Sequence, residues 1–218
     1  MEEVAPEELL DIYAAGYFPM AESHDTPELY WFQPEIRGVL PVEGFNVPHG
    51  MRKLLKTHDF TITIDKDFEA VMRACAELNA SRTETWINER IVQLYCSLHK
   101  MGDAHSVEIW QEDALVGGLY GVSIGGAFFG ESMFSRTEGA SKVALVSLAE
   151  LLKEAGYTLL DTQYVNDHLK QFGVEEVPHE DYMERLESAL SVSPNPSKYF
   201  CSLACSKGWL DSSNSNVK

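Results

Sequence analysis

The sequence predicts an α+β protein built on a mixed sheet with flanking helices. Three strand-like runs follow one another between residues 106 and 134, and residues 138–154 carry apolar side chains at helical spacing. A further strand-like run, residues 158–163, comes directly after that helix. A strand, a crossover helix and a second strand of this length imply parallel pairing, so the sheet combines antiparallel and parallel neighbours.

The N-terminal hundred residues predict a smaller, mainly helical domain that leads into the sheet. Gly16 and the Phe18-Pro19 turn end the first helix, and Gly102 ends the last one. Between them, the alternation in Phe60–Ile64 indicates a strand. The aromatic cluster at 29–32 precedes Pro34. The elements expected are helices over 7–15, 48–58, 67–78 and 88–101 and strands over 36–40 and 60–64.

The second half predicts the central sheet. Turns at residues 111–113 and 125–126 separate strands over 106–110, 114–124 and 127–134, which indicates an antiparallel meander. Helices over 138–154, 167–172 and 179–190 and a strand over 158–163 follow. This order matches the centre of acetyltransferase-like (GNAT) folds, an analogy of fold that says little about substrate. We expect a small domain over 1–60, a catalytic domain over 61–200 and a polar tail over 201–218 whose end is disordered.

Composition excludes several classes of function. The 218 residues carry 34 acidic against 17 basic side chains, a net charge of −17, which argues against broad nucleic-acid binding. No apolar run reaches the roughly 20 residues of a bilayer span, and the N-terminus lacks the features of a signal peptide. Four cysteines show no disulfide framework and seven scattered histidines no metal-ligand spacing. We expect a reduced, cytoplasmic protein without a metal or a membrane partner.

Two local features stand out against this background. Residues 44–58 contain no acid, and on a helix Arg52, Lys53 and Lys56 share one flank, which indicates either a solvated face or a nucleic-acid contact. Glu131 stands among Phe128, Phe129, Met133 and Phe134. An acid is expensive to bury there unless a cation or hydrogen-bond donor meets it, so Glu131 either reads a ligand's amine or faces water on an edge strand.

Several short motifs, taken in order, resemble the leucyl/phenylalanyl-tRNA–protein transferase family. Each motif is weak alone, but the set is collinear from about residue 7 to residue 200, and the ordered set is highly specific. The motifs are Gly16-Tyr-Phe-Pro19, Tyr30-Trp-Phe-Gln-Pro34, Thr85-Trp-Ile87, His105–Trp110, Leu115–Gly121, Phe129–Arg136, Ala140-Ser-Lys142, Leu160-Asp-Thr-Gln163 and Asn166-Asp-His168. The resemblance implies an acetyltransferase-like domain that works without coenzyme A or another cofactor. It also implies transfer of Leu or Phe, with Met as a further candidate, from aminoacyl-tRNA to proteins with N-terminal Arg or Lys, which marks them for degradation.

The resemblance also implies roles for individual residues. Glu131 accepts hydrogen bonds from the donor's α-amine, and Trp86 stacks on the terminal adenosine of the tRNA. Arg52, Lys53 and Lys56 contact the acceptor stem. The donor side chain enters an apolar pocket of Leu119, Phe128, Met133, Leu145 and Leu160, residues that would otherwise be read as ordinary core.

Asp161 and Gln163 are the candidate catalytic pair, because residues two apart on a strand face the same way. Aminolysis of an ester needs an aimed amine and a stabilised oxyanion. We expect Asp161 to orient Gln163 or the incoming amine, and Gln163 to hydrogen-bond the nucleophile near the carbonyl. The alternative is that Asp161 only caps a turn at the end of its strand.

The chain departs from the family in two places, and two other functions remain open. Met20 stands where the family usually has Trp, and the segment before the first helix is short. An acyl-CoA-dependent N-acetyltransferase is the first alternative, because Arg136–Ser141 approximates a pyrophosphate loop, although Glu138 would repel the phosphates. A non-catalytic binder of basic N-termini is the second. We expect a monomer.

Overall fold

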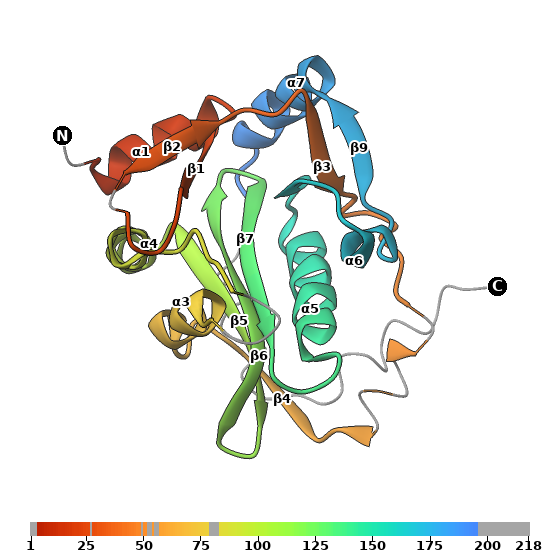
Figure 1. Ribbon diagram of the computed structural model, residues 1–218. Coiled ribbons are helices and arrows are strands. Elements are labelled where there is room, and N and C mark those ends of the chain that lie inside the picture. The colour runs from red at the N-terminus through yellow and green to blue at the C-terminus, as the bar shows by residue number, and fades with distance from the viewer. Residues whose placement is uncertain are drawn as a thin grey trace.

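The computed structural model describes residues 4–26, 28–48, 50–51, 54, 57–78 and 83–195. Within these residues, seven strands form one mixed sheet in the order β4-β5-β6-β7-β8-β3-β9, and β1 and β2 form a separate antiparallel pair (Figure 1). The strands are β1 Phe18–Ala21, β2 Leu29–Phe32, β3 Ile36–Leu40, β4 Phe60–Ile64, β5 Ala104–Gln111, β6 Ala114–Ile124, β7 Ala127–Ser135, β8 Leu159–Gln163 and β9 Glu175–Pro178. The helices are α1 Pro6–Ala14, α3 Phe68–Ala76, α4 Glu89–Met101, α5 Ala140–Ala155, α6 Asp167–Lys170 and α7 His179–Leu190.

The mixed α+β sheet predicted from the sequence is confirmed. Strands β5, β6 and β7 form the expected antiparallel meander, and β7 pairs in parallel with β8 after the crossover helix α5. Gly156 ends α5 in the left-handed region at φ +87°, where its lack of a side chain removes the steric cost. The crossover therefore returns β8 beside β7, which sets the two strands of the candidate site next to each other.

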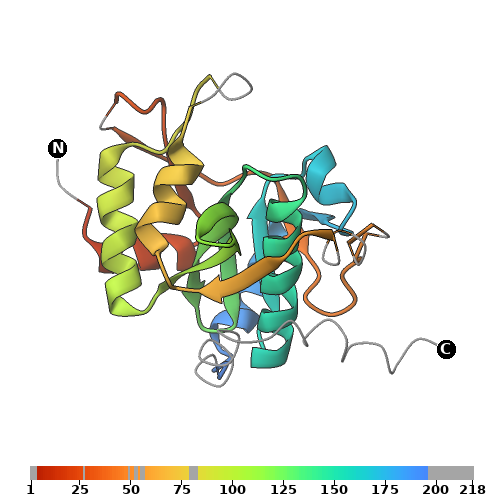
Figure 2. The ribbon, with the colours of Figure 1, turned by 90° about the horizontal axis from the view of Figure 1, so that it is seen from below.

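Helices cover both faces of the sheet and divide the core into two clusters. Figure 2 shows α3 and α4 on one side of the sheet and α5 on the other. Side chains from α1, α3, α4 and α7 form one buried cluster, which includes Tyr13, Tyr95, Phe129 and Tyr182. Side chains from α5 and α6 form the second cluster, with Phe128 and the apolar face of α5. Successive residues along β7, and likewise along β8, thus belong to opposite layers, as strand alternation requires.

The N-terminal part contains more strand than the sequence predicted. The described residues before 60 contain helix α1 but also strands β1, β2 and β3. The aromatic run at 29–32 lacks polar alternation, so its pairing as β2 with β1 was not predicted, and neither was the short acidic strand β9. Strand β3 joins the main sheet between β8 and β9. The predicted domain division at residue 60 stays a prediction.

Candidate active site

The candidate site lies where strands β7 and β8 separate. Their parallel pairing runs from Ala127–Leu159 to Phe129–Asp161 and then stops. On the other edge of β7, the register with β6 shifts between Tyr120 and Gly121, which leaves Glu131 as the extra residue of a β-bulge. Bulges redirect a side chain away from the regular pleat and often occur beside active sites. Glu131 is therefore presented at the opening between the two strands.

Hydrogen-bond donors from three different elements surround the Glu131 carboxyl group. The Tyr13 hydroxyl on α1 donates to Oε1 at 2.7 Å, and the Tyr95 hydroxyl on α4 lies 3.2 Å from Oε2. Gln163 on β8 donates from Nε2 to Oε1 at 3.2 Å. The two tyrosine hydroxyls also contact each other, and both rings are fully buried. Glu131 therefore does not face water on an edge strand, because β7 lies inside the sheet and the carboxyl contacts protein donors, and its recognition of a ligand's amine stays a prediction.

Burial and these hydrogen bonds shift the pKa values of Glu131 and of the two tyrosines. Burial raises the pKa of Glu131 to about 8, although the hydrogen bonds from Tyr13 and Tyr95 act in the opposite direction. Burial, and then the nearby Glu131 charge, raise the pKa of Tyr13 and Tyr95 well above the ordinary value, so both phenols stay protonated as donors. A partly buried carboxyl with a pKa near neutrality is suited to exchange a proton or pair with a cation.

A pocket of about 250 Å³ opens beside Glu131, between the separated strands and helix α5. It combines a leucine-rich wall with polar groups at the ends of β7 and β8. Its lining residues are Leu119, Tyr120, Gly130, Glu131, Ser132, Met133, Leu145, Leu148, Leu160, Thr162, Gln163, Asn166, His168 and Leu169. Four of the five predicted pocket residues are among them. Phe128 is fully buried in the α5-side core and lies outside this lining.

Asp161 faces the layer opposite to α5, where it meets Arg37 from β3. Its carboxylate accepts hydrogen bonds from Arg37 Nε at 3.1 and 3.0 Å and lies 2.9 Å from Arg37 Nη2. The Tyr182 hydroxyl on α7 donates to Oδ2 at 2.8 Å. Burial by itself would lower the pKa of Arg37, but the Asp161 charge outweighs it and raises that pKa, so the guanidinium stays charged.

Asp161 also holds the backbone of Gln163. The Gln163 N–H donates to Asp161 Oδ1 at 2.8 Å, and Gln163 has a φ of +54°, in the left-handed region that glutamine rarely adopts. That turn of the backbone directs the Gln163 amide to Glu131. The predicted catalytic pair is therefore together in the structure, but the two side chains have different partners.

Of the other predicted binding residues, the structure describes Trp86, which is not among the residues that line this pocket. Trp86 is half-buried before α4 and packs against the core cluster of α1, α3, α4 and α7. Met20 on β1 pairs with Tyr30 on β2. Arg52, Lys53 and Lys56 fall outside the described residues, so the structure leaves the predicted basic flank undescribed.

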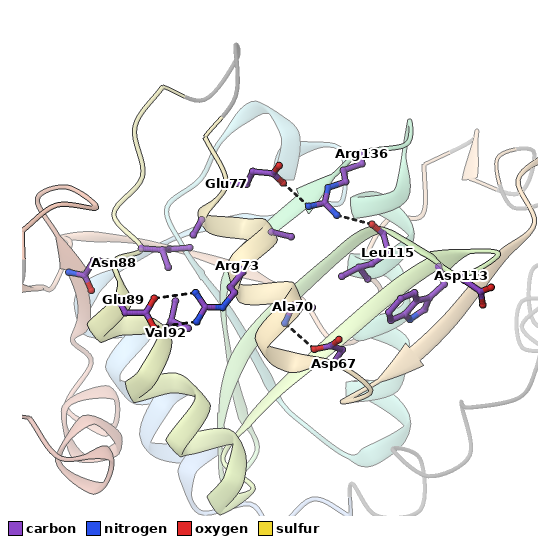
Figure 3. A pocket seen from close by; sticks show the side chains of 14 residues that line it. Asp67, Ala70, Arg73, Glu77, Asn88, Glu89, Val92, Asp113, Leu115 and Arg136 are labelled. Atoms are coloured by element: carbon purple, nitrogen blue, oxygen red, sulfur yellow. Dashed lines mark hydrogen bonds and ion pairs between the residues drawn. The ribbon is translucent and has the colours of Figure 1, made fainter.

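A second, wider hollow of about 700 Å³ lies between α3, the start of α4 and the tips of β5 and β6. Figure 3 shows that its arginines are held by acids: Arg73 pairs with Glu89 at 3.1 Å, and Arg136 pairs with Glu77 at 2.6 Å. These four side chains are exposed, so the ion pairs contribute little to stability. Ile87 and Asn88, which follow Trp86 in the chain, are among the residues that line this hollow.

The described part of the chain also limits other kinds of site. No group of three His, Cys, Asp or Glu side chains in it is close enough to hold a metal ion. None of its helices has the combination of length and apolar character needed to cross a lipid bilayer.

Comparison with known proteins identifies the family. The model of the leucyl/phenylalanyl-tRNA protein transferase family matches residues 39–187, and the model of that family's N-terminal domain matches residues 2–35. This chain belongs to that family. The break between the two matches lies at the start of β3, the strand that carries Arg37.

Curated relatives agree with the family match. A leucyl/phenylalanyl-tRNA–protein transferase of Paramagnetospirillum magneticum is 54% identical over 191 residues, which is 88% of this chain and 91% of the relative. One from Rhodopseudomonas palustris strain HaA2 is 53% identical over 188 residues, or 86% of this chain and 84% of the relative. A solved structure, of L-PGS from Bacillus licheniformis, has a TM-score of 0.43 and 12% identity over 83% of this chain and 61% of that one.

Sequence reasoning missed four residues of this transferase that surround the candidate site. Tyr13, Tyr95, Arg37 and Tyr182 each lie 21 or more residues in sequence from the acid that they contact. One signal was available for Arg37, since a lone arginine inside a predicted strand must meet an acid if that strand is buried.

Proposed function

We propose that this transferase moves a leucyl or phenylalanyl group, or a methionyl group, from tRNA to the α-amine of a protein that begins with Arg or Lys. The product is a new peptide bond, and the added residue marks the acceptor for degradation. The observation that carries the proposal is the position of Glu131, an acid with a raised pKa at the mouth of an apolar pocket of about 250 Å³. A ligand with a cationic amine next to an apolar side chain would use both features.

Donor recognition follows from this arrangement. The α-ammonium of the aminoacyl ester pairs with the Glu131 carboxylate, an ionised hydrogen bond of the stronger kind. The side chain of the donor enters the wall formed by Leu119, Met133, Leu145 and Leu160, with Phe128 supporting it from the core. Apolar pockets separate groups of similar size by only about 1–3 kcal/mol, so the wall accepts Leu, Phe and Met in preference to polar residues without choosing sharply among them.

The transfer step requires positioning more than proton abstraction. The acceptor amine attacks the ester carbonyl carbon, a C–N bond forms, the bond to the ribose oxygen breaks, and the proton lost by the amine ends on that oxygen. Gln163 hydrogen-bonds the attacking amine beside the carbonyl, and Asp161 orients Gln163 through its backbone N–H. An amide is a poor base, so Gln163 aims the nucleophile while the ribose hydroxyl or a water carries the proton.

The tRNA is held outside the pocket. Trp86 stacks on the terminal adenosine, and Arg52, Lys53 and Lys56 contact phosphates of the acceptor stem, which makes transfer salt-dependent. The net charge of −17 draws a basic acceptor N-terminus toward the site. We propose that the protein works as a cytoplasmic monomer, with an acetyltransferase-like sheet and without a cofactor.

A matched set of transfer reactions tests the proposal. The purified protein is given Leu-, Phe-, Met- or Arg-tRNA with radiolabelled amino acid, and model acceptors that differ only in an N-terminal Arg, Lys, Asp or Glu. We expect label from Leu-, Phe- and Met-tRNA on the acceptors with Arg or Lys. Label on Asp or Glu acceptors, or no label with any pair, would contradict the proposal.

Two controls separate the alternatives. Coenzyme A or an acyl-CoA titrated by calorimetry should give no binding, because Glu138 lies inside the loop that a pyrophosphate would need. Binding of a basic peptide without any tRNA-dependent product would favour a non-catalytic role.

A further inference from the structure

We propose that Arg37 is a positioning residue for Gln163, acting through Asp161. The inference rests on the proposed role of Gln163 and extends it by naming the group that fixes its geometry. Neither Asp161 nor Gln163 holds this arrangement alone, because the Asp161 carboxylate is itself oriented by the guanidinium of β3.

The contacts form a continuous chain from Arg37 to the pocket. Arg37 and Asp161 are 1% and 0% exposed, and Arg37 Nε donates to both carboxylate oxygens, at 3.1 and 3.0 Å. Oδ1 then accepts the Gln163 N–H at 2.8 Å, and the Gln163 amide reaches Glu131 Oε1 at 3.2 Å. A buried acid bound this way has its lone pairs committed, so its role is to hold the Gln163 backbone at φ +54°.

Arg37 is held in turn by three separate parts of the chain. Its Nη1 donates to the carbonyl oxygen of Gly16 at 3.0 Å. Its guanidinium lies 4.8 Å from the Phe18 ring centroid and 4.4 Å from that of Tyr182, which also donates to Asp161. A planar fork with five donors can make these contacts together, whereas a lysine ammonium is a point charge and cannot. Arg37 therefore contacts the N-terminal segment, β8 and α7 at once, and its partner on β8 is the acid that binds the Gln163 backbone.

A purely structural role for the buried pair is the competing explanation, and a double-mutant cycle separates the two. Arg37→Lys keeps a cation beside Asp161 but loses the fork. We expect kcat to fall by about tenfold or more, with KM for aminoacyl-tRNA changed by less than about threefold, because small displacements of a positioning group cost rate rather than binding. In the Arg37→Lys background, Gln163→Ala should lower kcat by less than about threefold further, because Gln163 is already misplaced.

The outcomes are distinguishable. If Gln163→Ala lowers kcat equally in both backgrounds, Gln163 keeps its proposed function and the positioning role of Arg37 is overturned. An unchanged kcat for Arg37→Lys also overturns that role. If Gln163→Ala is as active as wild type in the unaltered protein, the proposed function of Gln163 fails and this inference fails with it.

A second variant covers the case in which Arg37→Lys does not fold. Tyr182→Phe removes one hydrogen bond to Asp161 and keeps the ring against Arg37. Tyr157→Phe is the matched control, since its hydroxyl pairs with Ser123 at 2.7 Å and lies outside the pocket lining. We expect Tyr182→Phe to lower kcat by about threefold or more and to weaken the effect of Gln163→Ala, with Tyr157→Phe at the wild-type rate. Equal rates for the two tyrosine variants would overturn the proposal.

Discussion

The side-chain amide of Gln163 donates a hydrogen bond to Oε1 of Glu131 at 3.2 Å, directly beyond the point where β8 and β7 stop pairing. This contact joins the proposed amine-binding acid to the proposed nucleophile-positioning amide across the opening of the pocket. A ligand amine that enters must compete with or replace the Gln163 donor at Glu131. Binding of the donor and release of Gln163 for its role in transfer are therefore linked.

Binding of the donor should depend on pH with a maximum near pH 8. The Glu131 pKa is about 8, and a free α-amine titrates at about 7.7–8.0, whereas the bound pair shares one proton. Below pH 8, binding must release a proton, so the affinity falls by up to about tenfold for each unit by which the pH is lowered. Above pH 8, binding must take up a proton, so the affinity falls as the pH is raised. Calorimetry with a non-hydrolysable aminoacyl-adenosine analogue at pH 6, 7, 8 and 9 measures this. An analogue without the amine is the control, and a flat profile for the amine would contradict the assignment.

Glu131→Gln should stabilise the free protein increasingly as pH rises. The folded pKa of this acid is raised, so the folded state holds its proton more tightly than the unfolded chain. The free energy of unfolding therefore falls between the ordinary glutamate pKa of about 4.3 and pH 8, and Gln removes that loss. The melting temperature of the variant should exceed that of wild type by about 2–4 °C per kcal/mol recovered, more at pH 8 than at pH 5. An equal difference at both pH values would be inconsistent with the buried acid.

Tyr13→Phe should weaken the donor's binding although Tyr13 belongs to the N-terminal helix. Its hydroxyl donates to Glu131 and favours the carboxylate, so the pKa of Glu131 rises further when the hydroxyl is removed. A neutral hydrogen bond contributes about 0.5–1.5 kcal/mol, which corresponds to roughly two- to tenfold in affinity at pH 7. Calorimetric titration with the same analogue checks this. Tyr157→Phe, which changes a hydroxyl paired with Ser123, should bind normally.

Leu145→Ala should change the choice of donor, whereas Leu152→Ala should not. Both leucines are buried on α5, but only Leu145 lines the pocket. Each truncation costs about 2–5 kcal/mol of stability, so the pair is matched in that respect. Enlarging the wall should raise kcat/KM for phenylalanyl-tRNA relative to leucyl-tRNA by about tenfold, within the range available to an apolar pocket. The same shift in both variants would show that general loosening, and not pocket size, sets the preference.

Replacing the three cations of the predicted basic flank by alanine should weaken the binding of every aminoacyl-tRNA and leave the binding of an aminoacyl-adenosine analogue unchanged. Each of Arg52, Lys53 and Lys56 that contacts a phosphate adds close to one unit to the slope of log K against log salt. The triple alanine variant should lose up to about three units of slope with aminoacyl-tRNA and bind an aminoacyl-adenosine analogue normally. Lys100→Ala on α4 is the control. An unchanged slope in the triple variant would place the tRNA elsewhere.

The sequence was informative where physical signals are local. Turn residues separated the meander, helical spacing gave α5, and the length of the crossover required β8 to pair in parallel. The run at 29–32 gave no alternation, so β2 was missed, and the four-residue β9 carries two acids and a proline. Such short strands are fixed by their neighbours in the sheet and not by their own pattern.

In the candidate site, too, the residues with a local sequence signal were predicted and their partners from distant parts of the chain were not. Glu131, Asp161 and Gln163 were found from an acid among aromatics and from spacing on a strand, with the family resemblance supplying their roles. Their partners come from α1, β3, α4 and α7, and contacts across 21 to 124 residues leave no trace in local composition. The separation of β7 from β8 and the bulge at Glu131 are likewise products of pairing with β6 and β3.

One comparison tests the central claim, that Glu131 recognises the donor's α-amine, most directly. Transfer rates are measured for leucyl-tRNA and for the matching tRNA ester in which a hydroxyl replaces the α-amine, with wild type and with Glu131→Gln. We expect wild type to prefer the amine by about tenfold or more, since a hydrogen bond to a charged group contributes about 1.5–3 kcal/mol. Glu131→Gln should lose most of that preference while staying folded. If the variant keeps the full preference for the amine, Glu131 is not the group that recognises it.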